Sequence, residues 1–314
     1  MNHMGNNNLG QGKWLLETNG LTKKLGGKAV VNGVDLQLGE GDIYGFLGPN
    51  GAGKTTTIRM LLGLARPTRG TVKVFGQNLA EHRLNILRQV GSLVEYPSYY
   101  GHLTGRENLE IIRRLLDVPK ERIAEVLSIV RLEKDANRAA RGYSLGMKQR
   151  LGIAAALLGH PRLLILDEPT NGLDPAGIQE IRELIKSLPT ERGVTIMLSS
   201  HLLSEVEQMA TRVGIITAGK LVYQDSIERL KQRTAGRIRL NVSEPEAAWK
   251  RLLEQGYEAQ RDERGVTISG ENDREVAAIV TELVRERHLV YRVEEESSSL
   301  ESVFLEMTGT GGSL

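Results

Sequence analysis

Short apolar runs alternate with helical patterns from Trp14 to about Tyr223. Each run is bounded by turn residues, and the segment that follows it carries apolar residues at helical spacing. The pairs are DIYGFL and KTTTIRMLLGL within 42–64, RLLILDE and PAGIQEIRELIKSL within 162–188, and VTIMLSS and HLLSEVEQMA within 194–210. Strands that alternate with helices in this way predict a parallel sheet with crossover helices.

A second pattern precedes these pairs. In AVVNGVDLQL, at 29–38, apolar residues recur at every second position on either side of a turn-like Gly33. Period-two alternation is typical of an antiparallel strand with one buried face. We therefore expect an antiparallel layer beside the parallel core, which makes the first domain mixed α/β.

After Gln224 the order of patterns changes. The strand-like segments are GRIRLNV, the two halves of YEAQRDERGVTIS, and LVYRVEE, and the two halves are joined by a hairpin turn near Glu263 to Gly265. A helical segment, PEAAWKRLLEQ, follows the first strand, and another, DREVAAIVTELVRER, precedes the last. This β-α-β-β-α-β order predicts a ferredoxin-like domain. A last helix, SLESVFLEM, has a serine N-cap and places Leu300, Val303, Phe304 and Met307 on one face.

The composition permits two folded domains, because 40% of the 314 residues are hydrophobic. No apolar run reaches the roughly 18 to 20 residues of a bilayer span. The segment MNHMGNNNLGQGK at 1–13 has no signal-peptide pattern, so we expect a disordered tail and a cytoplasmic protein. The absence of cysteine excludes disulfides and thiolate catalysis. A net charge of +2 without a basic block does not favour nucleic-acid binding.

The segment from Gly48 to Thr56 fits the phosphate-loop pattern G-x-x-x-x-G-K-[ST] and lies between an apolar strand and a helix, as that pattern requires. Lys54 is expected to neutralise the β and γ phosphates, and the Thr55 hydroxyl to bind Mg²⁺. The alternative is a glycine-rich turn without a ligand. The residues expected to hold the phosphates are Gly48, Pro49, Asn50, Gly51, Ala52, Gly53, Lys54, Thr55 and Thr56.

Two carboxylates, Asp167 and Glu168, follow the aliphatic run LLIL. They are therefore expected at the carboxyl end of a parallel strand, where such sheets bind ligands. Asp167 can bind Mg²⁺, and Glu168 can orient and deprotonate a water that attacks the γ-phosphate. Taken alone, the run could equally be a strand that enters a charged turn.

Between these motifs lies YSLGMKQRL at 143–151, and with it the chain resembles the ATP-binding cassette (ABC) ATPases, whose motif is LSGGQ followed by a helix. Ser144 is expected to cap that helix, and its hydroxyl and the Gly146 N–H to form an anion site. An ordinary capped helix is the alternative. The resemblance implies ATP and Mg²⁺ as cofactors. It also implies a dimer, homodimeric or with a paired ABC ATPase subunit, because this element closes on the γ-phosphate bound by the opposite subunit.

Two further motifs follow in the family's order. NGLDP, at 171–175, is similar to the loop at the dimer seam and adds Asp174 to the nucleotide-binding residues. His201 is similar to the family's switch histidine, which contacts the γ-phosphate, although a histidine at a strand end is otherwise an ordinary polar cap. The resemblance thus implies Glu168 and His201 as the catalytic residues.

Some positions depart from the family pattern. Glu95 replaces the glutamine of the loop that joins the nucleotide site to the transport partner, and its carboxylate could keep the contact with Mg²⁺. Leu145 and Met147 replace smaller or polar residues, which implies weaker contacts across the dimer. Leu25 stands where an aromatic side chain usually stacks on adenine, so apolar contact would replace stacking. These variants and the ending SLESVFLEMTG are similar to the ATPases of bacterial bacitracin- and lantibiotic-type exporters.

The expected fold class is α/β: a P-loop NTPase cassette with a mixed sheet and a helical subdomain, followed by a small α+β ferredoxin-like domain. We expect the disordered tail at 1–13, the ABC ATPase domain at 14–232 with its helical subdomain at about 96–158, and the accessory domain at 236–308. The accessory domain could dimerise or regulate the ATPase, or only stabilise it.

The expected function is that of an ATP-hydrolysing exporter subunit. It would lie peripherally on the inner face of the plasma membrane and engage a separate transmembrane permease through the surface around Glu95 to Leu109. One alternative is a soluble regulatory, DNA-acting or ribosome-acting ABC ATPase, which normally has twin cassettes, a coiled coil or basic extensions that this sequence lacks. Another is a nucleotide sensor without turnover, against which Glu168 and His201 argue. The transported molecule does not follow from the sequence.

Overall fold

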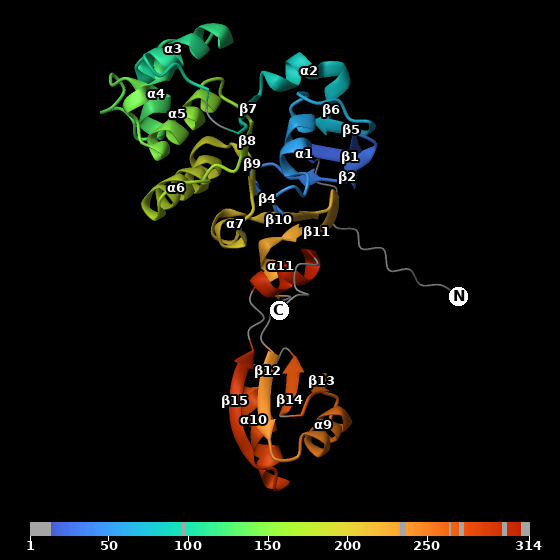
Figure 1. The fold of residues 1–314 in the computed structure, drawn as a ribbon. Coiled ribbons are helices and arrows are strands. Elements are labelled where there is room, and N and C mark those ends of the chain that lie inside the picture. Colours follow the sequence, from blue (N-terminus) through green and yellow to red (C-terminus); the bar gives the residue numbers. More distant parts are fainter. Residues whose placement is uncertain are drawn as a thin grey trace. The chain divides into compact units, whose positions relative to one another are not determined.

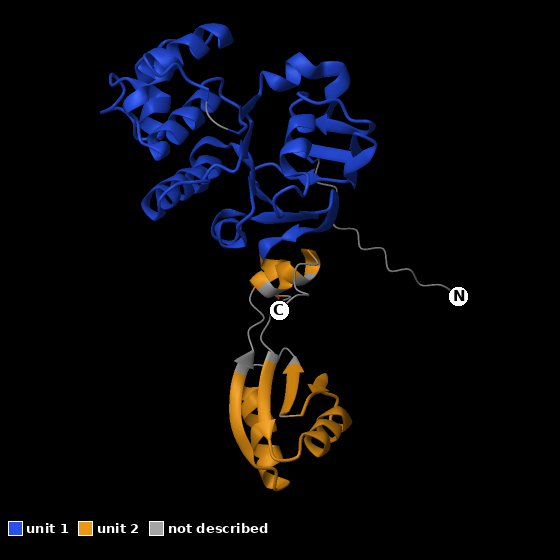
Figure 2. Cartoon of the chain, viewed as in Figure 1, with its two compact units in different colours: residues 1–227 blue, residues 228–314 orange. Residues whose placement is uncertain are grey.

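The chain forms two compact units, residues 1–227 and 228–314 (Figure 2). The structure is a computed structural model that describes residues 14–95, 98–232, 237–263, 265–269, 273–296 and 300–308. The division between the units falls within helix α8 (Ile227–Gln232), just before the expected domain end at 232. The expected tail at 1–13, the middle of the expected hairpin turn at 264 and the expected cap at Ser299 lie outside the described residues.

The larger sheet of unit 1 has the strand order β11-β10-β4-β9-β8-β7 (Figure 1). Neighbouring strands are parallel except for the β10–β11 pair, which is antiparallel. Its strands are β4 (Ile43–Leu47), β7 (Val90–Leu93), β8 (Leu163–Asp167), β9 (Thr195–Ser200), β10 (Arg212–Thr217) and β11 (Lys220–Ser226). All residues of β4, β8 and β9 are buried, which explains why apolar residues predominate in the three strands without strict alternation.

The register of this sheet places three strand ends together. Leu47 of β4 pairs with Ser200 of β9, and Ser199 of β9 pairs with Asp167 of β8. The segments that follow β4, β8 and β9 therefore leave the sheet at the same edge. Because the expected site residues lie in these segments, the register alone brings them close to one another.

An antiparallel sheet lies beside the parallel one and confirms the layer expected at 29–38. Its strand order is β2-β1-β5-β6, with β3 also paired to β1. These strands are β1 (Leu16–Leu25), β2 (Lys28–Val34), β3 (Gln37–Leu38), β5 (Arg69–Val74) and β6 (Gln77–Asn78). One hydrophobic core joins the two sheets, because Leu21 and Phe46 belong to the same cluster as Ile58 of helix α1 (Lys54–Leu61).

The remaining helices of unit 1 include the helical segment expected at about 96–158. They are α2 (Leu79–Leu87), α3 (Gly105–Leu116), α4 (Glu121–Ile129), α5 (Leu145–Leu157), α6 (Pro175–Arg192) and α7 (Leu203–Met209), with a short 3₁₀ turn at Ala140–Gly142. Helices α3, α4 and α5 group together on one side of β7 and β8 (Figure 1). None of the helices among the described residues is long and apolar enough to cross a bilayer.

Unit 2 has the expected β-α-β-β-α-β order. Its elements are β12 (Arg237–Val242), α9 (Pro245–Glu254), β13 (Ala259–Arg261), β14 (Gly265–Ser269), α10 (Asp273–Arg285) and β15 (Val290–Glu296), followed by α11 (Leu300–Thr308). The sheet order β13-β14-β12-β15 is antiparallel throughout, as in a ferredoxin-like domain. Leu240 and Ile268 of the sheet pack with Leu252 and Leu283 of the helices, so one sheet face forms the core.

Candidate functional site

The phosphate loop connects β4 to α1 and depends on glycine at two positions. Gly51 has a φ of 78° and Gly53 a φ of 109°, both in the left-handed region that disfavours other residues. A Cβ on Gly53 would lie 2.7 Å from the carbonyl oxygen of Val30, so the loop also has no room for a larger residue there. Helix α1 begins directly after Gly53, which turns its first N–H groups toward the loop.

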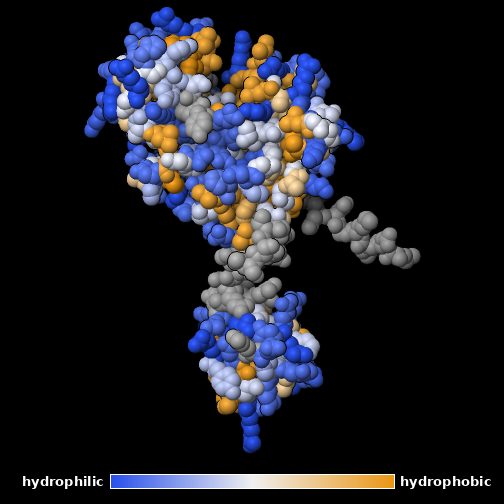
Figure 3. Space-filling view, in the orientation of Figure 1, coloured by the Kyte–Doolittle hydropathy of each residue, from blue (hydrophilic) through white to orange (hydrophobic). Residues whose placement is uncertain are grey.

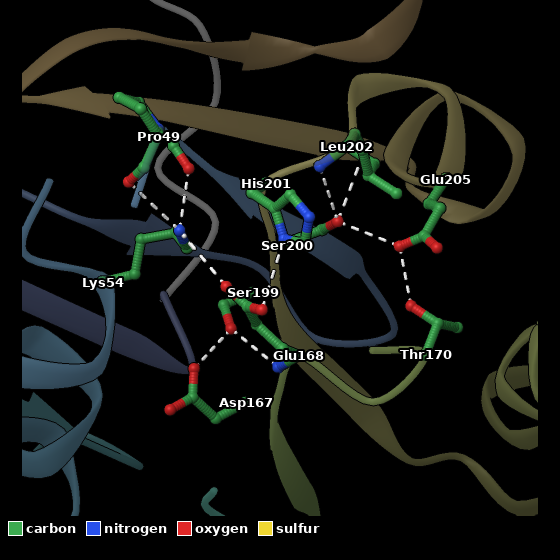
Figure 4. Close-up of polar contacts among 11 residues, drawn as sticks. Pro49, Lys54, Asp167, Glu168, Thr170, Ser199, Ser200, His201, Leu202 and Glu205 are labelled. Atoms are coloured by element: carbon green, nitrogen blue, oxygen red, sulfur yellow. Dashed lines mark hydrogen bonds and ion pairs between the residues drawn. The ribbon is translucent and has the colours of Figure 1, made fainter. Parts of the chain in front are cut away.

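Lys54 carries a buried positive charge inside this loop. Its side chain is 5% exposed, and its Nζ donates to the carbonyl oxygens of Gly48 at 2.7 Å and Pro49 at 3.3 Å (Figure 4). Nζ also lies 3.4 Å from Oε1 of Glu168. A buried ammonium group needs such partners, because burial without them is costly. The loop therefore holds a preoriented cation where the sequence predicted phosphate binding.

Ser199 fixes the two carboxylate residues at the end of β8. Its hydroxyl donates to Oδ1 of Asp167 at 2.5 Å and accepts from the backbone N–H of Glu168 at 2.9 Å (Figure 4). Asp167 is buried, whereas Glu168 leaves the strand with a φ of 48°. Because of this left-handed backbone turn, the side chains of Asp167 and Glu168 point in different directions. Such a strained conformation is often found at functional sites. Sequence reasoning missed Ser199, whose only signal was its place among the hydroxyl residues at the end of the buried strand β9.

The carboxylate of Glu168 lies between two basic side chains. Its Oε1 faces Lys54, and its Oε2 lies 3.2 Å from Nδ1 of His201 (Figure 4). His201 follows β9 directly, so the three residues come from the segments after β4, β8 and β9. The structure thus brings Lys54, Glu168 and His201 into one cluster, as the sequence predicted for a site that hydrolyses a phosphoanhydride.

Of the three residues expected to bind Mg²⁺, two have a side-chain oxygen available for the ion and the third forms an ion pair. Among the described residues, neither the Thr55 hydroxyl nor Oδ2 of Asp167 has a hydrogen-bond partner, and both are the hard oxygen ligands that Mg²⁺ prefers. These two residues fit the ion. Glu95 instead forms an ion pair with Arg59, and its side chain is 57% exposed. Leu25, the expected neighbour of the base, is exposed at the end of β1.

Ser144, Gly146 and Asp174 line a different cavity. Ser144 caps α5 by accepting from the N–H of Met147 at 3.2 Å, and Asp174 caps α6 by accepting from the N–H of Gly177 at 3.1 Å. The starts of α5 and α6 border an open cavity of about 470 Å³, which Leu145 and Gly172 also line. Within the part of the chain that the structure describes, no hydrogen bond or ion pair joins this group to Lys54 or Glu168.

Comparison with known proteins places the chain among ATP-driven transport proteins. Residues 31–171 match the family model of the ABC transporter. The bacitracin transport ATP-binding protein BcrA of Bacillus licheniformis is 50% identical over 245 residues, which cover 78% of this chain and 80% of that protein. The lantibiotic transport ATP-binding protein SrtF of Streptococcus pyogenes is 42% identical over 221 residues, 69% of this chain and 95% of that protein.

The fold has solved counterparts as well. A structure described as an ATP binding subunit of an ABC transporter superimposes with a TM-score of 0.63 and 30% sequence identity. The superposition covers 70% of this chain and 92% of that one.

Proposed function

Because this chain belongs to the ATP-binding proteins of ABC transporters, we propose that it powers export of a peptide antibiotic of the bacitracin or lantibiotic type through a separate permease. The family, its ATP hydrolysis and its mixed α/β cassette fold were expected from the motifs and are confirmed. The proposed cargo rests on one observation, the 50% identity to a bacitracin transport protein over most of both chains. The residue roles rest on the geometry around Glu168.

In this proposal, the phosphate loop holds ATP through its backbone N–H groups and Lys54. The loop N–H groups and the start of α1 provide partial positive charge, and Lys54 provides a full one. The carbonyl oxygens of Gly48 and Pro49 accept hydrogen bonds from Lys54 and orient its ammonium group within the loop. This orientation allows Lys54 to meet phosphate oxygens with little reorganisation of its side chain.

Glu168 is proposed as the general base. Its carboxylate accepts a proton from a water whose oxygen bonds to the γ-phosphorus, while the bond between that phosphorus and the bridging oxygen of ADP breaks. Lys54 and His201 each face one carboxylate oxygen and hold the group in place. His201 is proposed to contact the γ-phosphate from the same position.

Thr55 and Asp167 are the proposed ligands of Mg²⁺, and Ser199 orients Asp167 for this role. When bound, the ion supplies positive charge against the β and γ phosphates. Glu95 is proposed as a further ligand in a state in which its ion pair with Arg59 is broken.

The cavity at Ser144, Gly146 and Asp174 is proposed to receive the nucleotide of a second subunit. The start of α5 offers N–H groups and a helix dipole, which suit a phosphate. The residues that line this cavity include neither Glu168 nor any residue of the phosphate loop, which supports the proposal that one chain does not complete the site. A pair of subunits, each closing on the ATP of the other, does.

The permease is proposed to dock on α2 and α3. Figure 3 shows hydrophobic side chains gathered over these two helices in unit 1. Leu84 of α2 is 76% exposed and Leu115 of α3 is 80% exposed, and Tyr100 is exposed before α3. Leu109, the expected end of this surface, is buried and cannot take part. Docking there would place the chain on the inner face of the plasma membrane.

The C-terminal unit is proposed to be accessory. The lantibiotic relative matches 69% of this chain over 95% of its own length, so an ATP-binding protein of this family can be much shorter. The domain limits 14–232 and 236–308 remain proposals. The soluble regulatory or nucleic-acid-acting alternative is not favoured, because the relatives are named as transport proteins.

Purification of the full chain from membranes tests the exporter function. We expect an affinity-tagged chain, expressed with its genomic neighbours, to co-purify with a protein of several membrane spans. Bacitracin or a lantibiotic should then raise the ATP turnover of that complex in detergent, and an unrelated linear peptide of similar size should not. Recovery of only soluble or nucleic-acid partners would contradict the exporter function, and stimulation by neither antibiotic would contradict the cargo.

A further inference from the structure

A buried carboxylate lies behind the catalytic cluster. Glu205 of α7 is 6% exposed, and its Oε2 accepts two hydrogen bonds, from Thr170 Oγ1 at 2.7 Å and from Ser200 Oγ at 2.9 Å (Figure 4). Burial of a carboxylate is costly without such donors, so both hydroxyls are held strongly to it. Neither bond serves the steps assigned to Glu168, His201 or Lys54.

The two hydroxyls come from the two loops that carry the reacting groups. Thr170 lies two residues after Glu168, in a loop closed by bonds from Asn171 N–H to the Glu168 carbonyl and from Leu173 N–H to the Thr170 carbonyl. Ser200 is the last residue of β9 and precedes His201. Its hydroxyl also accepts from the Leu202 N–H at 3.0 Å, so it closes the turn on which His201 stands.

One cavity connects these parts. It has a volume of about 140 Å³, and both Glu168 and His201 line it together with Thr170, Ser200 and Glu205. The opposite end of the Glu168 loop is Asp174, which caps α6. A single oxygen atom of Glu205 thus ties the loop from Glu168 to Asp174 to the turn that carries His201.

We propose that Glu205 is a positioning residue for ATP hydrolysis. It fixes the distance between the loop from Glu168 to Asp174 and the turn that carries His201, and so holds His201 next to Glu168. The His201–Glu168 distance is 3.2 Å, so a displacement of about 1 Å between the loops breaks that contact and slows the reaction strongly. Among the described residues, no hydrogen bond or ion pair joins Glu205 to Lys54 or the phosphate loop, so ATP binding should not depend on Glu205.

Substitution of Glu205 in the full chain tests this role through a split between kcat and KM. We expect Glu205→Ala to lower kcat at least about tenfold and to leave KM for ATP within about twofold. Glu205→Gln should rescue most of kcat, because one amide oxygen has two lone pairs and can accept from both hydroxyls. Thr170→Val should lower kcat in the native background but have no further effect beside Glu205→Ala.

Thr195→Val provides the matched control for a purely structural effect. Thr195 is a fully buried threonine at the opposite end of β9, where its hydroxyl accepts from the Gly41 N–H at 2.9 Å. The Thr195→Val variant should lose stability, as Thr170→Val does, but its kcat should be unchanged. The proposal is overturned if Thr170→Val lowers kcat no more than this control, if Glu205→Ala raises KM as much as it lowers kcat, or if the Thr170 and Glu205 effects add. Thr170→Val and Glu205→Gln keep the test valid should Glu205→Ala not fold.

Discussion

Glu168→Gln is expected to lower the turnover number for ATP at least about 100-fold, the range that a general base contributes, while ATP binding is retained. Glutamine has nearly the same size, so it keeps the space beside Lys54 and His201. Its amide cannot accept the proton of the attacking water. The loss of the negative charge also removes an unfavourable neighbour of the γ-phosphate, so affinity for ATP should stay equal or increase.

Phosphate release at saturating ATP and Mg²⁺, together with equilibrium dialysis of labelled ATP, measures both effects. Glu191→Gln serves as the control, because Glu191 is an exposed glutamate on α6. It should match the native chain in both measurements. Unchanged turnover in Glu168→Gln would remove Glu168 from the role of base.

Lys54→Ala is expected to weaken ATP binding about 100-fold, near the upper end of what a charged hydrogen-bond donor contributes. Lys54 is the buried cation of the phosphate loop, and its removal leaves the carbonyl oxygens of Gly48 and Pro49 without that donor. Glu168 also loses its nearest positive charge and would then repel the γ-phosphate. Lys54→Ala should therefore lower both ATP affinity and ATP turnover, whereas Glu168→Gln should lower only turnover.

The same dialysis measurement compares Lys54→Ala with Lys73→Ala. Lys73 is an exposed lysine that pairs with Glu17 on the antiparallel sheet, so its removal should leave ATP affinity unchanged. An affinity of Lys54→Ala within about threefold of the native value would contradict the assignment of Lys54 to phosphate binding.

Much of the site could be predicted because it depends on strand ends. Apolar runs located β4, β8 and β9, and parallel strands leave a sheet at one edge, so Lys54, Glu168 and His201 had to lie near each other. The order of patterns after Gln224 likewise predicted the ferredoxin-like sheet, since its local elements allow few topologies.

The contacts that orient these groups could not be predicted. Ser199 and Ser200 are hydroxyl residues in a buried strand. Glu205 lies in the first turn of the short helix α7, and a glutamate on a helix is usually exposed to solvent. Asp167 lies 32 residues before Ser199, and the register of β8 and β9 brings the two together. Thr170 lies 35 residues before Glu205, and the packing of α7 against the sheet brings those two together. Arg59 and Glu95 are 36 residues apart, so no local pattern predicted their ion pair.

One chain is proposed to hold half of an ATP site, which a second chain completes. The molar mass of the full-length Glu168→Gln chain with ATP and Mg²⁺, measured by light scattering after size exclusion, tests this most directly. We expect a mass of twice 34.6 kDa with ATP and of 34.6 kDa when Lys54→Ala is added to the same chain. A mass of 34.6 kDa for Glu168→Gln at saturating ATP would contradict it.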